Sequence, residues 1–104
     1  MDCRKQYKVV VTPAAVRGLA KIVKFIAFDS PKNARLIKNE IMSDIRKLND
    51  MPERHPYIDD EYIPKFKYRK FIVYSRYIII YQVFDDTVRV DYVVDGYSDY
   101  INLL

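Results

Sequence analysis

A chain of 104 residues, half of them apolar and only two of them glycine, is long enough for one domain with a small core, and this composition excludes a disordered or loop-rich chain. Cys3 is the only cysteine, which excludes an internal disulfide framework, and no apolar run approaches the roughly 20 residues of a membrane span. We therefore expect a single domain over residues 1–104 that is soluble, cytoplasmic and without membrane contact.

The net charge of +4 is unevenly distributed along the chain. Residues 62–84 carry five basic and no acidic side chains, although they are the most apolar part of the sequence. Residues 50–61 and 85–104 each carry one basic and five acidic side chains. This segregation either builds a positive field that attracts polyanions, or is cancelled when the acidic segments fold back onto the basic one.

The first half of the chain predicts a strand at residues 5–11 and then two helices. Thr12-Pro13 and Ser30-Pro31 each place a capping hydroxyl before a proline at the first helical position. Because few residues separate the helices, they should form an antiparallel hairpin. Apolar residues recur at helical spacing in both and predict the buried faces: Val16, Leu19, Val23 and Ile26, then Ala34, Ile37, Ile41, Ile45 and Leu48.

The second half predicts a proline-rich loop at residues 51–64, and then three strands. The strands are expected at about 66–74, 76–84 and 88–94. The middle strand contains three consecutive isoleucines, so it should be covered on both faces, by the chain itself or on one side by a partner. Alternation in the last strand predicts four side chains on one face: Val88, Val90, Tyr92 and Val94.

The resulting order of elements is β-α-α-β-β-β, which predicts an α+β fold. In this fold a helical hairpin packs on one face of a mainly antiparallel, four-stranded sheet.

The sequence lacks the common catalytic motifs, including glycine-rich phosphate loops and metal-binding Cys/His clusters, so we expect no metal and no cofactor. Metal-independent RNA cleavage remains open, because arginines can hold the charge of a phosphorane while another side chain transfers the proton. If the strand begins early enough, Lys65, Lys67 and Arg69 share one face and Lys70 lies on the other. A basic row beside tyrosines suits RNA binding, but it also suits protection of a sheet edge.

The order of elements and the stretch YRKFIVYSRYIIIYQVFDDTVRVDYVVDGYSDY (68–100) resemble the RelE/ParE superfamily of bacterial type II toxins. YKVVVTPAAVRGLAKIVKFI is similar to the first strand, cap and helix of this family, and LNDMPERHP to the end of its second helix. The resemblance implies a toxin neutralised by a cognate antitoxin, whose C-terminal segment docks along the helices or an open sheet edge. RelE-like toxins cut mRNA in the ribosomal A site, whereas ParE-like toxins poison DNA gyrase.

The main interpretation is a RelE-like toxin that inhibits growth through ribosome-dependent mRNA cleavage. It implies catalytic roles for Arg69, Arg76, Tyr97 and Tyr100, and RNA binding by Lys65, Lys67, Arg69 and Lys70.

Two departures from the RelE pattern leave the enzymatic activity open. Ile78 stands where the third strand normally has an arginine, and the segment around Tyr97 has no basic residue. Losing one preorganised donor to a developing charge costs roughly 100-fold or more in rate. The alternatives are therefore a ParE-like gyrase poison without nuclease chemistry, or a fold relative with weakened activity.

Overall fold

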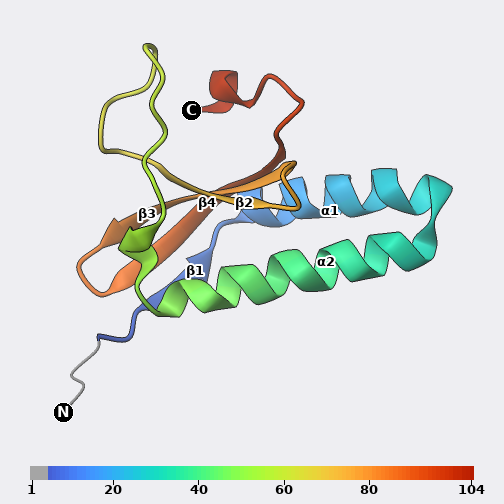
Figure 1. Ribbon diagram of the computed structural model, residues 1–104, viewed down its shortest axis with the longest axis horizontal. Coiled ribbons are helices and arrows are strands. Elements are labelled where there is room, and N and C mark those ends of the chain that lie inside the picture. The colour runs from blue at the N-terminus through green and yellow to red at the C-terminus, as the bar shows by residue number, and fades with distance from the viewer. Residues whose placement is uncertain (1–4) are drawn as a thin grey trace.

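The computed structural model describes residues 5–104, so Cys3 lies outside the described residues. Two helices pack on a four-stranded sheet of order β1-β4-β3-β2, in which β1 runs parallel to β4 and the other neighbours are antiparallel (Figure 1). This arrangement confirms the α+β fold predicted from the sequence. The elements are β1 (Lys8–Val11), α1 (Pro13–Asp29), α2 (Pro31–Arg46), β2 (Arg69–Val73), β3 (Tyr77–Phe84) and β4 (Thr87–Asp95), with 3-10 turns at Lys47–Asn49, Pro52–Arg54 and Tyr100–Leu103.

Both helices begin where the sequence predicts. The Thr12 hydroxyl accepts a hydrogen bond from the Ala15 amide, and the Ser30 hydroxyl accepts one from the Asn33 amide. Thr12 also donates to the carbonyl oxygen of Asp91 at 2.9 Å. One side chain therefore caps α1 and ties it to β4.

The buried face of α1 differs from the predicted stripe. Ala15 and Ile22 are buried and Leu19 packs against the same core, whereas Val16 is 56% exposed. The helix is turned because Gly18 lies directly against the backbone of Val93 in β4. The predicted face of α2 is confirmed, since four of its five residues are buried and the fifth packs against them.

The sheet is covered on both sides, as the consecutive isoleucines of β3 predict. Ile79 and Tyr81 pack against the helices, while Ile78 and Ile80 belong to a second core on the opposite face. The loop before β2 and the C-terminal segment lie on that opposite side (Figure 1). The second core is built from Ile58, Ile63, Tyr68, Ile78, Ile80 and Val94, with Tyr92, Tyr100, Ile101 and Leu104 packed against it.

The predicted alternation of β4 is wrong because the strand contains a β-bulge. Tyr81 pairs with Val90 while Ile80 pairs with Tyr92, so Asp91 has no partner in the register. Val88 and Val90 therefore face the helices, and Tyr92 faces the second core. Asp91 is buried and accepts hydrogen bonds from Gln82 at 2.8 Å and Arg89 at 2.6 Å.

The strand β2 begins at Arg69 instead of the predicted residue 66. Residues 64–67 form exposed turns before it. Phe66 adopts a φ of 62°, which an extended strand does not permit. Within residues 5–104, no helix has the length and apolar character needed to cross a bilayer.

Candidate functional site

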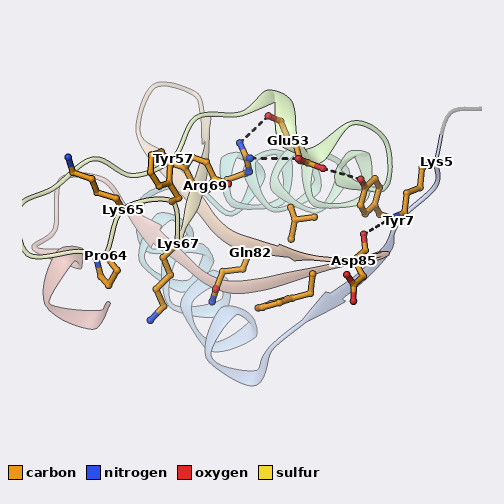
Figure 2. Close-up of a pocket in the computed structure, with 13 residues that line it drawn as sticks. Lys5, Tyr7, Glu53, Tyr57, Pro64, Lys65, Lys67, Arg69, Gln82 and Asp85 are labelled. Carbon is orange, nitrogen blue, oxygen red and sulfur yellow. Dashed lines mark hydrogen bonds and ion pairs between the residues drawn. The ribbon is translucent and has the colours of Figure 1, made fainter.

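A cleft of about 650 Å³ lies beside β2 and collects most of the predicted RNA-binding residues (Figure 2). Lys65, Lys67 and Arg69 line it, together with Tyr57 and with side chains from the N-terminal segment and the end of β3. Lys70 does not line the cleft. It pairs with Ile80 and thus belongs to the opposite face of β2 from Arg69.

Arg69 is held by the chain's own carbonyl groups. Its guanidinium donates to the backbone oxygens of Glu53 at 3.0 Å and His55 at 2.8 Å, and it lies 3.9 Å from the centroid of the Tyr57 ring. A guanidinium nitrogen is also 3.9 Å from a carboxylate oxygen of Glu53. Arg69 therefore fastens the loop after α2 to β2.

Arg76 is paired with Asp95 through two hydrogen bonds, of 3.1 Å from Nε and 2.8 Å from a terminal nitrogen. The Arg76 guanidinium holds the pKa of the Asp95 carboxyl below its usual range. The ring of Tyr97 lies 4.5 Å from the same guanidinium, and the Tyr97 amide donates to Asp95 at 2.9 Å. Arg76, Asp95 and Tyr97 thus form one cluster at the end of the β2–β3 hairpin.

The four candidate catalytic residues do not meet at one place. Arg69 pairs with Tyr81, whereas Arg76 directly precedes Tyr77, and the strand from Tyr77 to Tyr81 alone spans about 13 Å. Tyr100 packs against the second core. The structure brings Arg76 and Tyr97 together and leaves Arg69 and Tyr100 elsewhere, and their catalytic roles stay predictions.

Sequence reasoning missed an apolar groove of about 580 Å³ between α1 and α2. Three cations and no acid border its apolar floor. The sequence signal for this groove is the apolar stripe of α1. Val16 and Val23 belong to that stripe and were predicted to be buried, but they line the groove. Its lining comprises Val11, Ala15, Val16, Leu19, Ala20, Val23, Lys24, Lys38, Met42, Ile45, Arg46 and Val93.

His55 is the only histidine of the chain and lies behind the cleft. Its ring stacks on Phe71 with 4.0 Å between centroids, and meets the ring of Tyr81 edge-on at 6.4 Å. Burial lowers the pKa of His55, and the positive charge of Arg54 lowers it further. Among residues 5–104, no group of three or more His, Cys, Asp or Glu side chains is placed to hold a metal ion.

Comparisons with known proteins place the chain beside toxins. The family model described as "ParE toxin of type II toxin-antitoxin system, parDE" matches residues 9–100. A solved structure titled "Chromosomal ParDE TA system from P. aeruginosa" superposes with a TM-score of 0.71 and 13% sequence identity, over 86% of this chain and 96% of that chain. At this identity the similarity is one of fold. No curated protein matches the sequence.

Proposed function

We propose that this chain, which belongs to the ParE toxin family of type II toxin–antitoxin systems, inhibits growth by acting on DNA gyrase without nuclease chemistry of its own. The observation that carries this proposal is the family match, which spans residues 9–100. It favours the ParE-like alternative over the RelE-like interpretation that the sequence analysis put first. An antitoxin partner follows from membership in the family.

The state of the two arginines supports action without nuclease chemistry. A nuclease would need cations free to meet a scissile phosphate. Arg76 is neutralised by Asp95, and Arg69 is occupied by two backbone carbonyls. Ile78, at the position where RelE-like toxins carry an arginine, is buried in the second core. Neither arginine is therefore free to meet a scissile phosphate in this structure.

The direct test compares two targets with one purified protein. The chain is added to DNA gyrase with relaxed plasmid DNA and ATP, and separately to translating ribosomes that carry a defined mRNA. We expect loss of supercoiling or accumulation of cleaved plasmid, with intact mRNA. Cleavage of the mRNA in the ribosomal A site, with gyrase unaffected, would reinstate the RelE-like interpretation. No effect on either target would contradict both.

We further propose that the antitoxin docks in the groove between α1 and α2. The groove is apolar along its floor and is bordered by Lys24, Lys38 and Arg46. It therefore fits an amphipathic segment whose apolar face is flanked by acidic side chains. The groove also includes Val11 of β1, which is an edge strand of the sheet. A segment in the groove can therefore contact both the helices and the open sheet edge, the two docking surfaces that the resemblance implied.

This docking site has a matched pair of test positions. Val16 lies in the groove and is 56% exposed, while Leu36 lies outside it on α2 and is 55% exposed. Binding is measured by calorimetry with the product of the neighbouring antitoxin reading frame. Val16→Asp should weaken binding at least tenfold, because it places a carboxylate on the apolar floor, whereas Leu36→Asp should change it less than twofold. Equal effects of the two variants would remove the groove from the interface.

A further inference from the structure

The cleft beside β2 contains two exposed lysines without a carboxylate partner among the described residues. Four cations and two carboxylates line it. Lys5 donates to the backbone oxygen of Asp85 at 2.7 Å, and Arg69 is held by the carbonyls described above. Lys65 and Lys67 are exposed and form no ion pair with any described residue, and the Lys67 ammonium lies 5.0 Å from the centroid of the Tyr68 ring. Their charges therefore remain available to an anion.

An aromatic ring stands between these two lysines. Phe66 is 75% exposed and has a φ of 62°, an unfavourable conformation for a bulky residue. Strained backbone of this kind persists only where the surroundings impose it, and it is found disproportionately at binding sites.

The exposed ring of Phe66 contacts one neighbouring ring. The ring of Tyr57 meets Phe66 edge-on, with 5.4 Å between centroids and an interplanar angle of 79°. Tyr57 is in turn covered by the guanidinium of Arg69, which is anchored to the loop after α2. Arg69 thus supports Tyr57 from behind, while Phe66 and the two lysines remain exposed in the cleft.

The two lysine side chains leave the loop in different directions (Figure 2). They are therefore poorly arranged to grip one phosphate together, but well arranged to meet two phosphates on either side of a base. An exposed ring flanked by unpaired cations matches the chemistry of single-stranded nucleic acid, in which bases stack on aromatic side chains and cations follow the backbone.

We propose that the Lys65-Phe66-Lys67 turn binds single-stranded nucleic acid by stacking a base on Phe66 and pairing its flanking phosphates with the two lysines. This binding goes beyond the proposed function, because it does not require gyrase, an antitoxin or a nuclease reaction. DNA and RNA share the recognised chemistry, since the described cleft requires only a base and phosphates.

The test is fluorescence anisotropy with a labelled single-stranded thymidine dodecamer in about 50 mM salt. A duplex of the same length and a uridine dodecamer provide the comparisons. Phe66→Ala should weaken binding about tenfold, and Phe66→Tyr should stay within about twofold of wild type, because it keeps the ring. Lys65→Ala/Lys67→Ala should reduce the slope of log affinity against log salt by about 1.4.

Matched controls separate this site from general attraction to a basic protein. Phe28→Ala removes a ring of α1 that is 91% exposed, and Lys21→Ala/Lys32→Ala removes the same charge from exposed positions of the hairpin. Both should bind nearly as wild type does. The proposal fails if these controls lose as much affinity as the cleft variants, if the cleft variants bind normally, or if the duplex binds more tightly than the single strand.

The comparison of the thymidine and uridine dodecamers identifies which nucleic acid the turn prefers. Tighter binding of the thymidine or of the uridine oligomer would assign the turn to DNA or to RNA. Failure of this test leaves the gyrase and antitoxin experiments unaffected, because they measure gyrase activity and antitoxin affinity.

Discussion

The imidazole of His55 packs between aromatic rings, against Phe71 and beside Tyr81, where a positive charge is poorly compensated. Its Nε2 atom is buried and finds no hydrogen-bond partner among residues 5–104. Arg54 and Arg69 oppose protonation, while Asp44 favours it more weakly than burial and Arg54 oppose it. The pKa of the folded protein therefore lies below the ordinary value of about 6.5.

This depressed pKa predicts a stability that rises with pH. Between the folded and unfolded pKa values of His55, the unfolded chain binds more protons than the folded one. The contribution of the neutral imidazole to the free energy of unfolding is therefore fully present above about pH 6.5 and is lost as the pH falls. We expect a lower melting temperature at pH 5 than at pH 7.5. His55→Phe removes the titrating group and keeps a ring against Phe71, so its melting temperature should differ less between the two pH values. An unchanged pH dependence in this variant would contradict the assignment to His55.

Residue types alone did not reveal which cations are free. Arg69 and Arg76 were expected to meet RNA, yet both are bound by partners that are distant in sequence. Asp95 follows Arg76 by 19 positions, and only the pairing of β3 with β4 brings them together. Lys65 and Lys67, which were predicted to bind RNA, form no ion pair with any described residue, and their binding role stays a prediction. The exposed turn at Phe66 was missed because its position was assigned to a strand.

The helices and strands were predictable where neighbouring residues determine them, and were not where contacts distant in sequence do. The helix starts were predictable, because a capping hydroxyl and a following proline act within one turn. The bulge at Asp91 was not, since it arises in the pairing of β3 with β4, and neither was the rotation of α1, which depends on its contact with β4. Thr12 binds the bulged residue and Gly18 meets Val93, so α1 contacts β4 at the bulge and next to it.

The contact at Gly18 predicts an effect opposite to helix propensity. Alanine is favoured over glycine by about 1 kcal/mol inside a helix. A Cβ at residue 18 would collide with the carbonyl oxygen of Val93, however, and backbone atoms cannot give way cheaply. Gly18→Ala should therefore lower the free energy of unfolding by about 1–3 kcal/mol, measured by urea denaturation. Arg17→Ala, at the neighbouring exposed position, should change it by less than about 0.5 kcal/mol. A stabilised Gly18→Ala variant would mean that α1 can move away from the sheet.

At the scale of the whole molecule, the sheet separates two cores of different origin. The helical hairpin supplies the first, and its existence follows from the apolar spacing of two helices. The second is supplied by a loop and by the C-terminal segment, which have no regular periodicity. The sequence could therefore predict that β3 is covered on both faces, but could not tell whether the chain or a partner provides the second cover.

Removal of the C-terminal segment tests whether the second core contributes to stability. Deleting residues 99–104 takes away Tyr100, Ile101 and Leu104, which pack over Ile78 and Ile80. Because each of these side chains is only partly buried, we expect the free energy of unfolding to fall by about 2–4 kcal/mol in total. The truncated protein should also bind a hydrophobic dye at the uncovered face. Leu103→Ala removes an exposed side chain of the same segment and should cost less than about 0.5 kcal/mol. If the truncated protein unfolds at the wild-type denaturant concentration without binding dye, the helical hairpin and the sheet alone would account for the stability of this fold.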